Sequence, residues 1–165
     1  MRTRPDLIEH LPRLRRYARA LTWDVNRADD LVQDTLERAL AKLDLWQPES
    51  DLRAWLFTLM HNLFVNQLRR HHPAETALED ALNEPVSGGQ MEALIARDIN
   101  EALARLPEEQ RAVLLLVGLE QFDYAEAAQV LGVPMGTVMS RLSRARERMR
   151  HMLAGETAIK LKVVK

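Results

Sequence analysis

The chain has 165 residues and a mass of 19.0 kDa, a length that corresponds to one domain or to two small ones. Hydrophobic residues account for 47% and charged residues for 28%, as in ordinary soluble globular proteins. The formal net charge of −1 excludes a uniformly basic surface for nucleic acids and an acidic disordered chain. The absence of cysteine excludes disulfides, a thiol nucleophile and metal sites that need thiolates.

The sequence has no apolar run of the roughly 18 residues that a membrane span requires. Its N-terminal segment has no apolar core followed by a small-residue cleavage site, and so does not look like a signal peptide. We therefore expect a cytoplasmic protein without membrane insertion.

Charge is distributed unevenly along the chain. Residues 1–72 carry 12 basic and 10 acidic side chains, and residues 108–165 carry 9 basic and 7 acidic ones. Residues 73–107 carry only 2 basic and 7 acidic side chains. The near-neutral total thus combines two blocks of net charge +2 with an acidic middle of net charge −5.

Helix-breaking residues concentrate in the acidic middle, namely Pro73, Pro85 and the Ser87-Gly88-Gly89 run. Such a stretch buries little apolar surface and interrupts regular structure. We predict a flexible acidic linker over residues 73–90, which joins a domain of residues 1–72 to a smaller domain of residues 91–153. Residues 154–165 are expected to form a frayed tail.

Apolar residues recur with a helical period through the first domain. The positions of the first stripe are Leu7, Leu11, Leu14, Tyr17, Ala18 and Leu21. A second stripe predicts a helix over residues 28–43, and the spacing of Asn26 and Asp29 is that of a capping box. A third helix is predicted over residues 51–71, with Ser50 as its N-cap.

The second domain also has a helical pattern. One helix is predicted over residues 91–106, and Pro107 separates it from a helix that continues to Gly118. Asp123 and Glu126 have the spacing of a capping box for a short helix.

Gly132 has the position of a left-handed stop after that short helix, and a last helix is predicted over residues 134–153. No segment predicts a paired strand. The sequence therefore predicts an all-α fold of two small helical domains, an N-terminal helical bundle and a C-terminal helix-turn-helix, joined by a flexible acidic linker.

The short helix, the glycine turn and the longer helix have the spacing of a helix-turn-helix. Hydroxyl and guanidinium groups share a sector of about 100° on the second helix, at about 100° per residue. These residues are Thr137, Ser140, Arg141, Arg144 and Arg148. Arginines suit phosphates or a guanine edge, and short hydroxyls suit phosphates and close base contacts. A solvated basic face is the alternative, and the glycine turn favours DNA binding.

The first domain has two further polar patterns. Asp30, Gln33, Asp34 and Glu37 form an acidic helix face, which is typical of a solvated surface and lacks the facing Glu-x-x-His pairs of a carboxylate metal site. Residues 46–57 combine aromatic and polar side chains, which suit either unstacked bases or core packing. The five histidines have no ligand spacing. We expect no metal, no other cofactor and no catalytic residue, and hence a protein that is not an enzyme.

Two sets of motifs resemble known sequence regions. Residues 29–35, 53–57, 62–63 and 69–70 resemble region 2 of bacterial sigma factors. Residues 106–111, 124–126, 131–141 and 144–146 resemble region 4 of the same proteins. A short chain with only these two regions is similar to the extracytoplasmic-function (ECF) group of the sigma-70 family.

The resemblance implies a transcription initiation factor that binds core RNA polymerase, through the clamp helices of the β′ subunit and through the β subunit. It places polymerase-binding residues at Asp30, Gln33 and Asp34. It implies contacts with the minus-ten promoter element and the melted strand by Ser50, Arg53, Asn62, Arg69 and Arg70. It implies contacts with the minus-thirty-five element by Thr137, Ser140, Arg141, Arg144 and Arg148.

The resemblance also implies a cytoplasmic protein that associates with the nucleoid when bound to polymerase and is held inactive by an anti-sigma factor. Met139 stands at a recognition-helix position that is often basic in the group, which affects the base preference. Two alternatives remain. One is a helix-turn-helix regulator that acts without polymerase, and the other is a sigma mimic that sequesters an anti-sigma factor.

Overall fold

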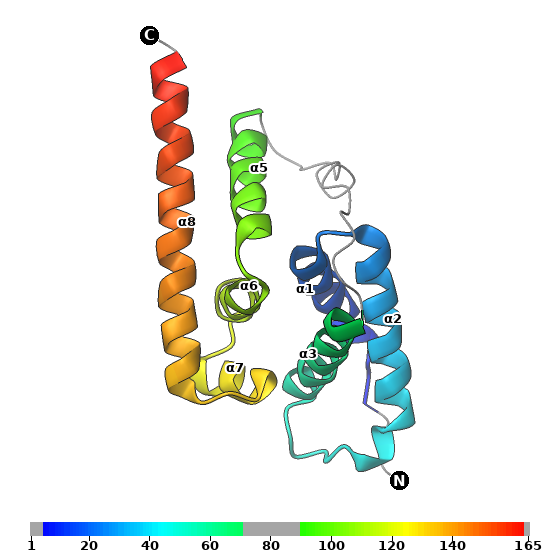
Figure 1. Cartoon of the computed structure of the whole chain (residues 1–165). Helices are drawn as coiled ribbons and strands as arrows, with labels where there is room; N and C mark the ends of the chain where they lie inside the picture. The colour runs from blue at the N-terminus through cyan, green and yellow to red at the C-terminus, as the bar shows by residue number, and fades with distance from the viewer. Residues whose placement is uncertain (1–4, 71–89, 164–165) are drawn as a thin grey trace.

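The computed structural model describes residues 5–70 and 90–163. Within these ranges the regular structure is helical throughout, without a strand, and the helices form an N-terminal and a C-terminal region (Figure 1). The predicted all-α fold of two helical regions is confirmed. The predicted linker over residues 73–90 lies almost entirely outside the described residues, and the first helix after it begins at Gln90.

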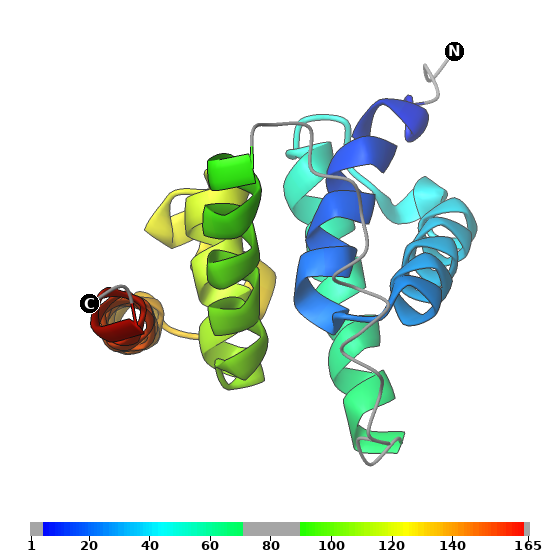
Figure 2. The same cartoon turned by 90° about the horizontal axis from the view of Figure 1, so that it is seen from above.

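The N-terminal region is a bundle of three α-helices in which α2 packs against both α1 and α3 (Figure 2). Its elements are the 3₁₀ turn η1 (Ile8–His10), α1 (Leu11–Thr22), α2 (Val25–Ala41), the 3₁₀ turn η2 (Leu43–Leu45) and α3 (Leu52–Arg70). The apolar stripe predicted for the first helix is largely buried, with Leu14, Tyr17 and Leu21 fully inaccessible. The helical period in the sequence therefore identifies the face of α1 that forms the core.

Two predicted N-caps in this region are wrong. The N-cap of α2 is Asp24, whose carboxylate accepts the Arg27 N–H at 3.1 Å, because Trp23 ends α1 in a left-handed conformation and leaves Asp24 extended. The Ser50 hydroxyl does not cap α3 but donates to the Gln47 carbonyl at 2.7 Å. The Asp51 carboxylate instead accepts the N–H of Arg53, in the first turn of α3, at 3.0 Å.

The C-terminal region contains four α-helices. Its elements are α5 (Gln90–Arg105), α6 (Glu108–Leu114), the π-helical turn η3 (Leu115–Leu119), α7 (Tyr124–Leu131) and α8 (Met135–Val163). The predicted capping box of Asp123 and Glu126 is present in both directions, and Gly132 has the left-handed φ of 66° that ends α7. The capping box begins α7 and the left-handed glycine ends it just before α8, so the helix-turn-helix is confirmed.

The last helix is longer than predicted. The frayed tail was expected from residue 154, but α8 continues without interruption to Val163 (Figure 1). The segment contains no proline and is rich in residues of high helix propensity, so nothing in it stops a helix that is already nucleated. None of the helices in the described part of the chain is long and apolar enough to cross a membrane.

Arg111 ties the end of α5 to the rest of the molecule. Only 8% of this residue is exposed, and its guanidinium donates to four main-chain carbonyls. The acceptors are the carbonyls of Leu103, Ala104 and Leu106 at 2.8, 2.7 and 2.9 Å and of Leu21 in α1 at 2.8 Å. Burial lowers the pKa of Arg111, an effect that nearby Glu108 opposes, and the group stays charged.

The two regions share one hydrophobic core. Buried side chains of α1, α2 and α3 and those of α6, α7 and the start of α8 belong to a single cluster. In the views of Figures 1 and 2, the C-terminal helices lie against α1 and α3, and α8 runs along the outer side. Packing of the two regions on each other was not predicted from the sequence.

We predict that Arg111→Met lowers the free energy of unfolding by about 3 kcal/mol, because it leaves several buried carbonyls without a donor. Urea denaturation followed by circular dichroism measures this change. Arg13→Met, on the exposed face of α1, is the matched control and should stay within about 0.5 kcal/mol of the wild type. Equal losses in the two variants would contradict the bonding assigned to Arg111.

Candidate functional site

The first part of α8 presents the face predicted to bind DNA. Val138, Leu142 and Ala145 point inward and are buried, which turns the opposite side of the helix outward. Ser140, Arg144 and Arg148 are exposed there, and Thr137 is half-buried at the start of the helix. These side chains are brought together by the period of the helix alone, so a continuous surface of hydroxyls and guanidiniums is present.

Arg141 differs from the other members of this face. Its side chain is only 24% exposed and lies 3.7 Å from the Glu109 carboxylate of α6. It also lines a groove of about 430 Å³ between the two regions, which includes His61 and Arg69 of α3. A residue predicted to bind the minus-ten element therefore shares one groove with a residue predicted to bind the minus-thirty-five element.

The predicted minus-ten residues do not form one patch. Asn62, Arg69 and Arg70 are exposed on the later part of α3. Arg53 lies in its first turn, about 25 Å from Arg70 along the axis at 1.5 Å per residue. Ser50 is exposed just before the helix begins.

The acidic face of α2 is exposed and adjoins α3. Asp30, Gln33 and Asp34 are all exposed, and the Gln67 amide of α3 donates to the Asp34 carboxylate at 3.3 Å. A groove of about 420 Å³ between the two helices is lined by Asp34 and, at its other side, by Arg70. The predicted polymerase-binding face is therefore continuous with one end of the predicted DNA-binding surface.

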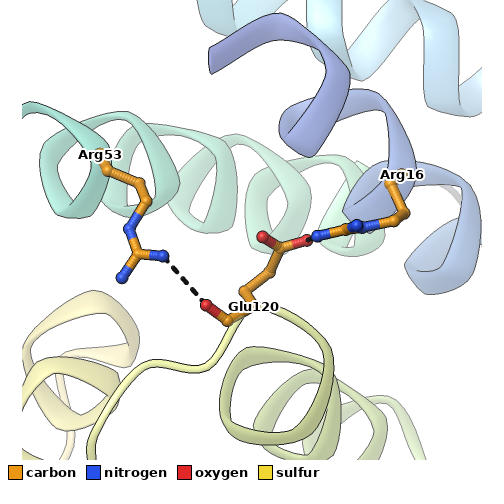
Figure 3. Close-up of polar contacts among 3 residues, drawn as sticks. All are labelled: Arg16, Arg53 and Glu120. Atoms are coloured by element: carbon orange, nitrogen blue, oxygen red, sulfur yellow. Dashed lines mark hydrogen bonds and ion pairs between the residues drawn. The ribbon is translucent and has the colours of Figure 1, made fainter. Parts of the chain in front are cut away.

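Glu120 forms a polar cluster that no sequence pattern predicts. Its side chain is fully inaccessible, and Oε1 accepts from Nη2 and Nε of Arg16 in α1 at 3.1 and 3.3 Å (Figure 3). Its main-chain carbonyl accepts from Nη1 of Arg53 in α3 at 3.0 Å. The second carboxylate oxygen, Oε2, is buried and has no hydrogen-bond partner in the described part of the chain.

Aromatic rings surround this cluster. The Arg53 guanidinium stacks over the Phe122 ring at 4.1 Å from the centroid, and Phe122 packs edge-on against Phe57 of α3 at 5.2 Å. Phe57 in turn packs against Tyr17 of α1 at 5.2 Å. Burial, and next the Glu120 carboxylate, raise the pKa of the Tyr17 hydroxyl. Only one local signal pointed to Glu120, namely a carboxylate directly after a long apolar run.

His61 faces the groove between the regions. Desolvation by burial, and next the charge of Arg141, lower the pKa of His61 from 6.5 to about 4. Its Nδ1 atom is buried without a hydrogen-bond partner among the described residues. His61 therefore lies at the interface between the two regions.

Comparisons with known proteins agree with this geometry. Residues 7–61 match the family model described as the Sigma2 domain of PhyR, and residues 96–149 match the model of sigma-70, region 4. The chain is 40% identical over 152 residues to the ECF RNA polymerase sigma factor EcfG of Rhodopseudomonas palustris, which covers 91% of this chain and 84% of that protein.

Solved structures extend the agreement to three dimensions. The sigma factor RpoE of Bartonella quintana, in complex with the anti-sigma factor NepR, superposes with a TM-score of 0.78 at 36% identity and covers 90% of this chain and 94% of that one. The PhyRSL–NepR complex of Sphingomonas sp. Fr1 superposes with a TM-score of 0.64 at 27% identity, over 88% and 85% of the two chains.

A helix-turn-helix with an exposed arginine face, joined to a bundle that matches sigma region 2, defines a two-region sigma factor. The chain belongs to the ECF RNA polymerase sigma factors of the sigma-70 family. The family resemblance predicted from the sequence motifs is confirmed.

We predict that stability falls as the pH is lowered from about 6.5 to about 4, because unfolded chains protonate His61 in this window and the folded chain does not. The His61 share of the loss is about 1–3 kcal/mol, since one pKa unit corresponds to about 1.4 kcal/mol. Urea denaturation of the wild type and of His61→Gln across this pH range measures it. Parallel pH profiles would contradict the burial assigned to His61, because carboxylates titrate equally in both proteins.

Proposed function

We propose that the chain binds core RNA polymerase and directs it to promoters that carry a minus-thirty-five and a minus-ten element. The observation that carries this proposal is the exposed face of Ser140, Arg144 and Arg148 on α8, in a chain whose other domain presents a separate acidic face on α2. A DNA-reading surface and a distinct protein-binding surface on one small chain suit a factor that lends specificity to an enzyme. The chain itself catalyses no reaction in this proposal.

The recognition helix α8 reads the duplex at the minus-thirty-five element in this proposal. Thr137, Ser140, Arg141, Arg144 and Arg148 enter or flank the major groove, where arginine and hydroxyl groups read guanine edges and phosphates. Met139 is 51% exposed on the same helix and offers no charge, so it suits an apolar contact such as a thymine methyl.

The N-terminal domain binds the minus-ten element and core polymerase in this proposal. Asn62, Arg69 and Arg70 lie on the exposed end of α3, which suits the backbone and bases of a melted strand. Ser50 in the loop before α3 and Arg53 in the first turn of α3 approach that strand from the other end of the helix. Asp30, Gln33 and Asp34 dock on the β′ clamp helices, since their exposed acidic face on α2 complements a basic partner.

An anti-sigma factor regulates the chain in this proposal. The RpoE and PhyR structures that resemble it were both determined with the anti-sigma factor NepR bound, at 36% and 27% identity. The chain acts in the cytoplasm and reaches the nucleoid with polymerase.

A sigma mimic that sequesters an anti-sigma factor is the second candidate, because the N-terminal match is to the Sigma2 domain of PhyR. Run-off transcription separates the candidates. The full-length chain is added to core polymerase on a template with the promoter region of its own gene. Promoter-specific transcripts support the sigma factor, whereas tight binding to an anti-sigma factor without transcripts supports the mimic. Duplex binding without any polymerase requirement supports an independent regulator.

We predict that Arg144→Ala with Arg141→Ala lowers transcription from a minus-thirty-five-dependent promoter about tenfold or more, since each specific base contact contributes about 1–3 kcal/mol. Arg146→Ala is the matched control, because Arg146 lies about 180° around the helix from Thr137 at 100° per residue. Transcript yield from a linear template measures both. A loss as large in the control would show that total charge matters and that the assigned face does not.

We predict that Asp30→Ala with Asp34→Ala weakens binding to core polymerase about tenfold, because rim charges that complement a partner steer and orient docking. Fluorescence anisotropy of the labelled chain measures the dissociation constant. Asp44→Ala, exposed in η2 away from this face, should bind like the wild type. Unchanged binding in the double variant would remove the acidic face from the polymerase interface.

A further inference from the structure

Glu120 has no part in the proposed contacts with DNA or polymerase, yet it joins the two domains. Its carboxylate accepts from Arg16 of α1, and its carbonyl accepts from Arg53 of α3 (Figure 3). The π-helical turn η3 brings it there, since the Glu120 N–H bonds to the Leu115 carbonyl five residues back. Such turns often mark functional positions in helices.

The closed arrangement occupies residues that the proposed function needs. The Arg53 guanidinium donates to the Glu120 carbonyl and stacks on the Phe122 ring. Arg141 is paired with Glu109, and it lines the same groove of about 430 Å³ as Arg69. The two promoter-contacting surfaces are therefore partly turned toward each other.

Promoter geometry requires these surfaces to separate. About 25 base pairs lie between the minus-thirty-five and minus-ten positions, which is about 85 Å of duplex at 3.4 Å per base pair. Residues that line one groove of about 430 Å³ cannot reach both elements at once. The domains must therefore move apart before the chain contacts a promoter at both places.

We propose that the contacts of Glu120 with Arg16 and Arg53 form an autoinhibitory latch that holds the free chain closed. This inference rests on the proposed function, because it assigns promoter contact to the open state. In the closed state Arg53 is withheld from DNA and Arg141 lines the groove between the domains; in the open state Glu120 is hydrated, Arg53 is free and the groove no longer covers Arg141.

The chemistry of the contact suits a latch that can open. A buried ion pair loses in desolvation much of what it gains in attraction, whereas removing one partner leaves an unpaired buried charge and strongly destabilises the closed state. The side chain of Arg16 is 52% exposed, and Oε2 of Glu120 lacks a partner. Opening returns the carboxylate to water, and this gain offsets part of the cost of exposing the shared apolar core and of breaking the hydrogen bond from Arg111 to the Leu21 carbonyl.

The direct test removes Arg16, which belongs to neither the proposed DNA surface nor the polymerase surface. Arg16→Ala leaves the Glu120 carboxylate buried and unpaired in the closed state, so the equilibrium shifts toward the open state. The readouts are energy transfer between dyes on Lys42→Cys and Ser143→Cys, and run-off transcription at limiting chain concentration. No native cysteine interferes with this labelling.

We expect lower energy transfer in Arg16→Ala and about threefold or more transcript, because apparent affinity scales with the population of the competent state. Arg13→Ala, exposed on the same helix, should match the wild type in both readouts. The double variant Arg16→Ala with Glu120→Gln should return energy transfer and transcript yield toward the wild-type values, because a neutral amide is less costly to bury than an unpaired carboxylate. A gain of transcript cannot arise from damage to the fold.

A reversible cross-link provides the converse test. Arg16→Cys with Gln121→Cys, joined by a reducible bismaleimide, holds η3 against α1 with the arginine absent. The locked chain should give no promoter-specific transcript, and reduction should restore it. Chains that carry either cysteine alone and the same reagent are the controls.

Each outcome decides the proposal. Unchanged energy transfer in Arg16→Ala, or full transcription by the locked chain, overturns the latch. Lower energy transfer without more transcript shows a contact that is not inhibitory and also overturns it. If no variant supports transcription, the wild type included, the proposed function fails first and the inhibitory role falls with it, although the energy-transfer result still reports the contact.

Discussion

Two arginines, each donating to a main-chain carbonyl at a helix end in the opposite domain, determine how the halves of this molecule meet. Arg111 of α6 reaches the Leu21 carbonyl in the last turn of α1, and Arg53 of α3 reaches the Glu120 carbonyl just after η3. The last carbonyls of a helix have no partner within it and carry partial negative charge, so they attract a guanidinium. Because Arg111 also satisfies three carbonyls around the end of α5, the α5–α6 corner and the domain contact share one side chain. These two arginine–carbonyl contacts help to place the recognition helix relative to the N-terminal bundle.

Most of the local structure could be predicted from the sequence, because its causes lie within a few residues. The capping box of Asp123 and Glu126, the left-handed Gly132 and the inward stripe of α8 each depend on neighbours along one helix. Where two nearby residues compete for the same role, sequence alone chose wrongly: Asp24 caps α2 where Asn26 was expected, since the backbone at Trp23 decides which residue is extended. The Arg16–Glu120 ion pair joins residues 104 positions apart, and no periodicity or spacing relates them.

The residues of the candidate site likewise fall into two groups: those that one helix places and those that tertiary contacts place. The face of α8 and the acidic face of α2 are properties of single helices, so the residues expected to share a surface are found together on it. Arg53 and Arg141 were grouped with their neighbours by motif, but tertiary contacts set them apart, one on Phe122 and the other beside Glu109. An arginine has five donors and a planar group that stacks, so it serves an internal carbonyl, a ring or a phosphate equally well. The position of such an arginine in a motif predicts that it makes a contact, but it does not predict whether its partner is a carbonyl, a ring or a phosphate.

The distribution of charge explains why such contacts can be exchanged. The domain of residues 1–72 carries a net charge of +2 and the domain of residues 91–153 a net charge of −1, so long-range electrostatic attraction between them is small. What holds them is short-range: the shared apolar core, which includes a chain of three aromatic rings from Tyr17 to Phe122, together with a buried carboxylate and two carbonyls. A DNA phosphate offers Arg53 a stronger, charge-assisted acceptor than the neutral Glu120 carbonyl does. Promoter DNA and the domain interface then compete for Arg53, and the near-neutral total charge, which at first argues against nucleic acid, keeps that competition local to a few side chains.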